Sequence, residues 1–338
     1  MTIKDIAALC GVSVSTVSRV LNNHPDVSAQ VRSRVMEVVQ ANHYIPSNSA
    51  RDLVRTRSDA IGLVVRGTAN PFFAEVLKTM EAKVTEAGYT MVLHQIGTCD
   101  DELQAGAMLE RDKKLRGLLL LGGRSDYAKN DVAALNVPFV CCTYDNSYGT
   151  LGEEEYSSVS IDDEQEACRA VKSLIGKGHR RIAALISARN DRSISELRYG
   201  GYRRALKEAG IALDETLVEE TGSFQMPEAY EAMERLLKRT GEFTALFAIS
   251  DAMAVAAIKA LDDAGRRVPE DCSVIAIDGI TMSAYTLPTL STLIQPADQI
   301  AAEAVRILVD RIEGRAAGRH VQVATILRPG RSVCVNQE

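Results

Sequence analysis

The sequence predicts a small all-α head followed by an α/β body made of two doubly wound parallel-sheet subdomains. Two patterns lead to this fold class. Over roughly the first 46 residues, apolar side chains recur at helical spacing. From Ala60 onward, apolar runs of strand length alternate with amphipathic helices, and this series begins twice. A chain of 338 residues also suits two or three domains better than a single core.

The stretch from Ile3 to Asn22 has the pattern of a helix-turn-helix. Apolar residues keep a spacing of three and four on both sides of Gly11, which supplies the positive φ that ends a first helix. Ser13 or Ser15 can cap a second helix, whose outward side chains would be short or basic. The alternative is a helical hairpin that binds nothing. The short turn and the small exposed side chains favour DNA binding.

A third helix is expected after Val27-Ser28, with valines that pack across the first two helices. The segment that follows, residues 47–57, has three arginines but almost no apolar face. So short a helix cannot offset its nucleation cost alone in water. We therefore expect either a linker or a helix that forms only when something covers it.

The body is expected to contain two series of parallel strands, because nearly continuous apolar strands between helices indicate sheets covered on both faces. The expected strands are 60–65, 90–95, 117–121, 139–144, 159–162, 181–187, 218–223, 245–250 and 273–278. Helices are expected at 72–87, 100–114, 127–136, 163–177, 195–209, 227–239 and 252–265. Three leftover elements, 291–295, 298–313 and 321–327, are expected to cross back and complete the two sheets, leaving a cleft between them.

Charge and cysteine content restrict the class of protein. Residues 1–58 hold seven basic and four acidic side chains, a net charge of +3, so the remainder carries −9 of the total of −6. A basic head on an acidic body fits a protein that contacts phosphate with one end only. The seven cysteines include no Cys-x-x-Cys pair and are expected to be reduced thiols. No signal segment or membrane-length apolar run is evident, so a soluble cytoplasmic protein is expected.

Motifs in one order along nearly the whole chain resemble the lactose-repressor (LacI/GalR) family of bacterial transcription regulators. They are Thr2–Asn22, Val27-Ser28, Tyr44-Ile45-Pro46-Ser47, Ala50-Arg51-Asp52-Leu53, Ala60–Val65, Asn70-Pro71-Phe72-Phe73, Gly178–Ala183, Val268-Pro269-Glu270-Asp271 and Pro288–Thr292. The resemblance implies a helix-turn-helix head on a periplasmic-binding-protein-like body. It places the DNA-binding domain at 1–46, a hinge at 47–58 and an effector-binding and dimerisation domain at 59–338. Within that domain the N-subdomain would be about 59–160 plus 293–320, and the C-subdomain about 161–292 plus 321–338.

The resemblance also implies a homodimer that reads a pseudo-palindromic operator in double-stranded DNA. Val14, Ser15 and Arg19 match base-reading positions, where arginine can fork onto a guanine and valine can touch a thymine methyl. Leu53 matches a leucine that a hinge helix pushes into the minor groove, and Ser49 and Ala50 match small residues that let two hinge helices cross. The full expected DNA-binding set is Thr2, Ser13, Val14, Ser15, Thr16, Ser18, Arg19, Asn22, Ser28, Tyr44, Ala50, Arg51 and Leu53.

Ligands of open parallel sheets bind beyond the carboxyl ends of the strands, so residues at and after the expected strands are candidates for an effector site. These are Asn70, Phe72, Phe73, Tyr144, Asp145, Arg192, Phe247, Asp251 and Asp278, together with Arg198, which matches an effector-binding arginine of the family. Carboxylates and guanidinium groups beside an aromatic ring suit the hydroxyls and ring face of a sugar. Other roles stay open: a helix cap for Asp251, a core position for Phe72 and a solvated loop charge for Arg192.

These patterns predict a repressor whose operator affinity is controlled by a small effector, with a sugar or sugar derivative that releases DNA as the favoured case. A purine or a phosphoprotein acting as corepressor is the alternative within the family. A secreted solute-binding protein would need a signal peptide and no basic head. A dinucleotide-dependent enzyme is disfavoured because no Gly-x-Gly-x-x-Gly follows a strand, no nucleophile elbow occurs and the five histidines lack metal-ligand spacing. No cofactor or metal is expected, and the chain after Val333 carries no heptad tail, which favours a dimer over a tetramer.

Overall fold

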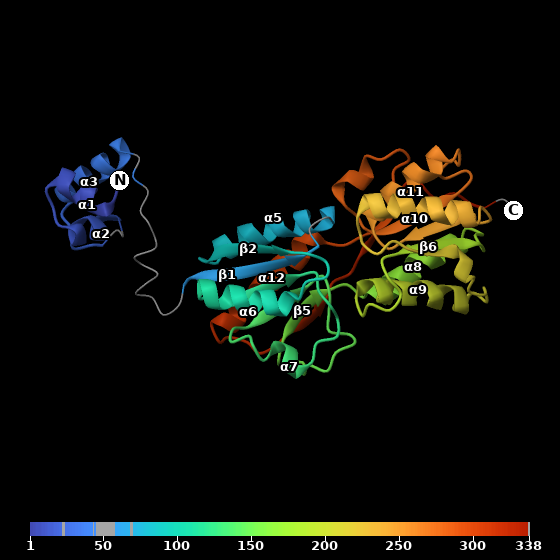
Figure 1. Cartoon of the computed structure of the whole chain (residues 1–338), viewed down its shortest axis with the longest axis horizontal. Coiled ribbons are helices and arrows are strands. Elements are labelled where there is room, and N and C mark those ends of the chain that lie inside the picture. Colours follow the sequence, from blue (N-terminus) through green and yellow to red (C-terminus); the bar gives the residue numbers. More distant parts are fainter. Residues whose placement is uncertain (22–23, 43, 45–57, 68–69, 337–338) are drawn as a thin grey trace. The chain divides into compact units, whose positions relative to one another are not determined.

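The computed structural model describes residues 1–21, 24–42, 44, 58–67 and 70–336. The chain divides into two compact units, Met1–Arg57 and Ser58–Glu338, which are called the head and the body below (Figure 1). The expectations for Asn22, Ser49, Ala50, Arg51 and Leu53 fall outside the described residues.

The head is a three-helix unit of α1 (Ile3–Cys10), α2 (Val14–Leu21) and α3 (Ala29–Ala41). Gly11 takes φ 63° directly after α1, so the predicted glycine turn is present. Ser13, rather than Ser15, caps α2, because its Oγ accepts the Thr16 amide at 3.1 Å. The core of the head is closed by apolar side chains from all three helices: Ile6, Ala7, Cys10, Val17, Val20, Val35 and Val39.

The first sheet of the body has six parallel strands in the order β11-β5-β4-β3-β1-β2. Its strands are β1 (Ala60–Arg66), β2 (Thr90–Ile96), β3 (Gly117–Leu121), β4 (Phe139–Cys142), β5 (Ser157–Ser160) and β11 (His320–Gln322). Its helices are α5 (Pro71–Glu86), α6 (Glu102–Lys113), α7 (Lys129–Val132) and α12 (Ala297–Ile312). Alternate residues of β1 enter two separate clusters, Leu63 and Val65 in one and Val64 in the other, so this strand is covered on both faces.

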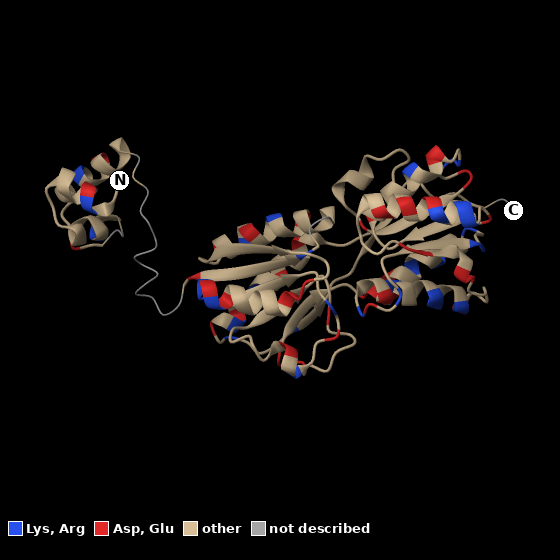
Figure 2. Ribbon diagram, viewed as in Figure 1, with Lys and Arg blue, Asp and Glu red and all other residues tan. Residues whose placement is uncertain are grey.

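The second sheet has the order β12-β10-β9-β8-β6-β7, and only β12 runs antiparallel to its neighbour among the described strands. Its strands are β6 (Ile182–Ile186), β7 (Val218–Glu220), β8 (Ala245–Ala248), β9 (Ser273–Asp278), β10 (Ser291–Ile294) and β12 (Ile326–Arg328). The helices are α8 (Asp163–Ile175), α9 (Ile194–Glu208), α10 (Met226–Arg239) and α11 (Asp251–Asp263), with short 3₁₀ turns η1 (Glu215–Leu217) and η2 (Thr281–Ala284). Charged residues of both signs are spread over the helices of the body (Figure 2).

Two details of the predicted fold are wrong. The strand expected over 321–327 is two strands, β11 and β12, because the chain passes from the first sheet to the second between Gln322 and Ile326. The two predicted crossing points between the subdomains also fall inside strands: 293 lies in β10 and 320 in β11. The helix expected over 127–136 is only the four-residue α7, which has no fully buried residue and touches the core only through the half-buried Val132. Within the described residues, no helix is both long and apolar enough to cross a bilayer.

Candidate effector site and DNA-binding surface

The outer face of α2 carries the small and basic side chains that the sequence singled out. Val17 and Val20 are buried, whereas Val14, Ser15 and Arg19 are exposed, Val14 by 41%. Arg19 forms an exposed ion pair with Asp26, with 3.1 Å between Nη1 and Oδ2. An exposed pair of this kind contributes little stability, so the guanidinium can be transferred to a base or a phosphate at low cost.

The other described members of the predicted DNA-binding set lie at helix starts or on the head surface. Thr2 forms a capping box with Asp5 at the start of α1, and Ser28 caps α3 by accepting the Val31 amide. Such helix starts present backbone amides that suit phosphate oxygens. Three further members are half-buried: Thr16, Ser18 and Tyr44, the last of which packs on the core of the head.

In the body, a buried arginine joins two carboxylates at the carboxyl edge of the second sheet. Arg198 on α9 is 1% exposed and donates from Nε to Asp163 Oδ1 at 2.7 Å and from Nη1 to Asp278 Oδ1 at 3.3 Å. Its Nη1 also donates to the carbonyl of Ile249. Burial raises the pKa of Asp163 to about 6 and also raises the pKa of Asp278, while Arg198 opposes both shifts. One arginine between two carboxylates leaves an excess of acceptors for ligand hydroxyls.

Asp278 is also contacted by side chains that reach it from two further elements. Gln295, just after β10, donates from Nε2 to Oδ1 at 2.8 Å. Asn70, which caps α5 by accepting the Phe72 amide, donates from Nδ2 to Oδ2 at 3.4 Å. Because α5 covers the first sheet and Asp278 ends a strand of the second, this last hydrogen bond joins the two subdomains.

Two backbone contacts join the subdomains as well. The Ser125 amide donates to the Arg192 carbonyl at 2.8 Å, and the Thr281 amide donates to Glu75 Oε1 at 2.7 Å. The carboxyl edges of the two sheets therefore face each other, and the cleft that the sequence predicts is expected between them.

Strained backbone conformations occur at the carboxyl edges of both sheets. Three non-glycine residues with positive φ follow or end strands there: Thr143 at 72°, Arg192 at 48° and Asp278 at 130°. Such conformations cost of order 1–3 kcal/mol each and persist mainly where function needs the geometry. Sequence patterns do not reveal them, since none of the three is glycine or asparagine.

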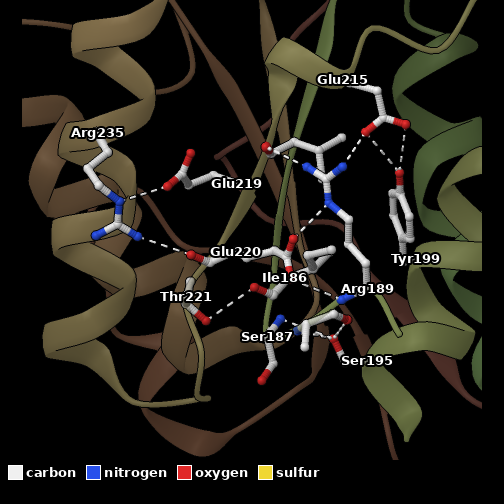
Figure 3. Close-up of polar contacts among 12 residues, drawn as sticks. Ile186, Ser187, Arg189, Ser195, Tyr199, Glu215, Glu219, Glu220, Thr221 and Arg235 are labelled. Carbon is white, nitrogen blue, oxygen red and sulfur yellow. Dashed lines mark hydrogen bonds and ion pairs between the residues drawn. The ribbon is translucent and has the colours of Figure 1, made fainter. Parts of the chain in front are cut away.

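A polar network holds the loop after β6 that carries Arg192 and leads into α9 (Figure 3). Ser195 Oγ accepts the amides of Ser187 and Ala188, both at 3.0 Å. Arg189 forms ion pairs with Glu215 at 2.5 Å and Glu220 at 2.9 Å. The loop is thereby fixed to β7 and η1, and this fixes the start of the helix that presents Arg198.

Of the ten predicted effector residues, Asn70, Arg198 and Asp278 come together as described. Phe73 is half-buried, and its ring lies so close to Gly122 that a Cβ there would meet ring atom Cζ at 2.9 Å. Arg192 is exposed and adjoins the cleft through its backbone carbonyl. Asp145 is half-buried and accepts the Tyr156 hydroxyl at 2.6 Å.

Three predicted effector residues are core residues instead. Phe72 packs in the main core, and Phe247 stacks on Tyr202 with 6.5 Å between ring centroids. Tyr144 is buried on the α6 side of the first sheet, with its hydroxyl 3.0 Å from that of Tyr127. These aromatic side chains fill the space between sheet and helix, so placing each at a strand end was not enough to expose it.

Asp251 is also buried, and it has neither of the roles that the sequence left open. Ser250 caps α11, whereas the Asp251 carboxylate accepts the Ile280 amide at 3.0 Å and the hydroxyls of Ser283 and Thr292. Burial raises its pKa to about 7. Asp251 therefore fixes the segment around η2 rather than a ligand.

Sequence reasoning did not single out Asp163, Gln295 and Arg66. The first two flank strand ends, so the rule that selected Asp278 applied to them as well. Arg66 is the last residue of β1, one position beyond the predicted strand.

Comparison with known proteins decides the family. A family model described as bacterial regulatory proteins, lacI family, matches residues 2–47, and one described as a periplasmic binding protein-like domain matches 171–333. Over 329 residues the chain is 38% identical to the HTH-type transcriptional regulator MalR of Clostridium butyricum, covering 97% of each protein. The chain belongs to the lacI family.

Solved structures agree with this assignment. A transcriptional regulator CelR–cellobiose complex has a TM-score of 0.71 and 32% identity, covering 98% of this chain and 99% of that one. A Lac repressor dimer bound to operator and an anti-inducer has a TM-score of 0.77 at 23% identity, covering 99% of both chains, and supports the fold. As a lacI-family member, the chain is a DNA-binding transcription regulator and not an enzyme. The predicted family, fold class and regulatory function are thus confirmed.

Proposed function

We propose that the chain is a repressor that releases its operator when a sugar or sugar derivative binds between the two sheets of the body. The carrying observation is the buried set of Arg198, Asp163, Asp278 and Gln295, with Asn70 reaching it from the other subdomain. Charged acceptors beside amide and guanidinium donors can hold neighbouring sugar hydroxyls through strong, directional hydrogen bonds. The half-buried Phe73 offers an apolar ring for the face of a sugar. The solved relative bound to cellobiose supports a saccharide.

The coupling to DNA follows from the hydrogen bond between Asn70 and Asp278. A sugar hydroxyl that binds Asp278 competes with Asn70, whose Oδ1 also caps α5. Loss of this bond favours a rotation of one subdomain against the other. In a homodimer, that rotation changes the spacing of the two hinge segments, residues 47–58, and thereby decides whether Leu53 can enter the minor groove.

For operator recognition we propose that Val14, Ser15 and Arg19 read bases in the major groove. Ser13, Thr16 and Ser18 on the same helix, and Thr2, Asn22, Ser28, Tyr44, Ala50 and Arg51 elsewhere, are proposed to contact the DNA around them. Small side chains let α2 approach base edges closely, and Arg19 can donate two hydrogen bonds to one guanine. All seven cysteines are free thiols, which fits a regulator that works in the cytoplasm.

The proposed homodimer needs a surface that a second copy covers. Tyr285 is 82% and Leu287 is 94% exposed, next to η2, and large apolar side chains this exposed in one short segment mark a contact surface. A two-fold axis there would bring each segment against its copy. A Leu287→Asp variant is expected to lower the mass measured by sedimentation to that of a monomer.

The direct test selects an operator from random duplexes with the purified chain and then measures its affinity with and without saccharides. Weaker operator binding in the presence of a sugar supports the proposal. Tighter binding would identify a corepressor instead, and a response to purines alone would reject the saccharide.

A further inference from the structure

Arg66 is an arginine without the partners that its burial calls for. It ends β1 and is half-buried, and its nearest carboxylate oxygen is Glu102 Oε2 at 3.6 Å from Nε, too far for a hydrogen bond. Its guanidinium makes no hydrogen bond to another described residue, and Nε is buried. A guanidinium carries five N–H donors, and a buried donor without an acceptor costs stability. Such a group points to an acceptor that the chain itself does not supply.

Unpartnered acceptors lie beside it. Glu102 is fully buried at the start of α6. Its Oε1 accepts the Arg124 amide at 2.8 Å and the Tyr127 hydroxyl, whereas Oε2 has no hydrogen bond. Ser125 Oγ and Asp126 Oδ1 are likewise buried without a hydrogen bond to a described residue. Since β1 and β3 are neighbours in the sheet, about 5 Å apart, these atoms gather at one edge.

This edge faces the opposite subdomain. The Ser125 amide donates to Arg192 of the opposite subdomain at 2.8 Å. A Cβ at Gly122 would lie 3.1 Å from the Arg66 carbonyl and 2.9 Å from the Phe73 ring, so the ring lies close to Arg66. The opposite wall contributes Gln295 Oε1, also buried and without a partner. Acceptors without a hydrogen bond therefore occur on both sides, and the Arg66 donor occurs on one.

The charges at this edge oppose an anionic ligand. Three arginines near this edge, Arg66, Arg124 and Arg198, lie within 4 Å of five carboxylates, although not all of these contacts are hydrogen bonds: Asp101, Glu102, Asp126, Asp163 and Asp278. Even with the exposed Arg192 counted as a fourth arginine, the carboxylates outnumber the arginines, so the net charge at this edge disfavours a phosphate or a carboxylate. A mixture of free donors and acceptors matches hydroxyl groups, each of which both donates and accepts.

We infer that Arg66, Glu102, Ser125 and Asp126 form a subsite for the hydroxyl groups of an uncharged sugar, with Arg66 as the residue that determines its affinity. The inference rests on the proposed function and narrows it, because sugar phosphates and sugar acids are excluded. Arg66 donates to one or two hydroxyl oxygens, and the carboxylates of Glu102 and Asp126 accept from hydroxyl hydrogens.

The test measures thermal stabilisation of the full chain by neutral sugars and their anionic counterparts. The pairs are glucose with glucose 6-phosphate, ribose with ribose 5-phosphate, and cellobiose with cellobionate. We expect a neutral sugar to stabilise the chain and its counterpart to bind at least about tenfold more weakly. Arg66→Met should weaken the neutral sugar by roughly 10-fold to 100-fold, the range for a lost charge-assisted hydrogen bond.

Arg116→Met is the matched control. Arg116 precedes β3 at the amino edge of the same sheet, at the opposite end from Arg66. Its substitution should therefore leave the sugar affinity unchanged. Equal or stronger binding of the anionic sugars would overturn the inference but leave a sugar-controlled repressor in place. Unchanged affinity in a folded Arg66→Met variant would also overturn it. No response to any saccharide, with operator binding intact, would reject both the inference and the sugar effector.

Discussion

The hydrogen bond between Asn70 and Asp278 can be broken and rebuilt by substitutions that replace a carboxylate with an amide or an amide with a carboxylate. In Asp278, Oδ1 accepts from Arg198 and Gln295, whereas among the described residues Oδ2 accepts only from Asn70. In Asp278→Asn, the amide oxygen can keep the place of Oδ1. The amide nitrogen then faces the Asn70 nitrogen, so two donors meet and the bond between subdomains is lost. Contacts within the C-subdomain are kept.

The size of the effect follows from the geometry. A hydrogen bond to a carboxylate contributes about 1.5–3 kcal/mol, and at 3.4 Å the lower end applies. A shift of about 1.5 kcal/mol in the equilibrium between subdomain arrangements is roughly tenfold. We therefore expect sugar-free Asp278→Asn to bind operator up to about tenfold more weakly. It should also bind sugar poorly, because a ligating carboxylate is gone.

The double variant Asn70→Asp/Asp278→Asn rebuilds the bond with its polarity reversed. Residue 70 would then offer a carboxylate, with one oxygen still free to cap α5, and residue 278 an amide donor. Operator affinity, measured by fluorescence anisotropy without sugar, should return close to that of the original chain, whereas the sugar response should stay low. If the two changes are merely additive, to within about 0.5 kcal/mol, the bond does not couple the subdomains and the reasoning fails.

Three further predictions concern other parts of the chain. Arg19→Met should weaken specific operator binding by about 1–3 kcal/mol but nonspecific DNA much less, and equal losses in a binding titration would remove Arg19 from base reading. Burial raises the pKa of Asp251 to about 7, so its carboxylate form is disfavoured in the folded chain. The free energy of unfolding should therefore fall by up to about 4 kcal/mol as pH rises from 4 to 7. Urea titrations followed by circular dichroism should show that Asp251→Asn lacks this fall, whereas exposed Asp262→Asn on the same helix keeps it. Gly122→Ala should lower the melting temperature more than Gly210→Ala. Both glycines have positive φ, but only a Cβ at position 122 would meet the Phe73 ring and the Arg66 carbonyl. Equal shifts in melting temperature would show that the Phe73 ring moves aside freely.

The sequence predicts the head and the alternation of the body because both depend on local periodicity. Gly11 and the valines of α2 and α3 are enough to define three helices and their inner faces. The split of the last strand into β11 and β12 was not predictable, because periodicity does not reveal which of two sheets a short apolar run joins.

Residues of the effector site were predicted less completely, for two physical reasons. Selecting residues at the ends of predicted strands gives their position along the chain but not the direction of their side chains. The selection therefore included Tyr144 and Phe247, whose side chains are buried in the cores, together with Asp278. Buried charges are also recognised only through their partners. Asp163 is identified as a site residue only by its hydrogen bond to Arg198. Arg198 lies 35 residues away in sequence and was assigned by family resemblance alone.

The order of strands in the first sheet has a consequence for synthesis on the ribosome. Its edge strand β11 pairs with β5, although His320 and Ser158 are 162 residues apart, and its covering helix α12 is also made late. The three-helix head, by contrast, closes its core within the first 44 residues. During translation the DNA-binding head can therefore fold well before the body is complete, and the first sheet is completed only when its edge strand β11 has been made, close to the end of synthesis.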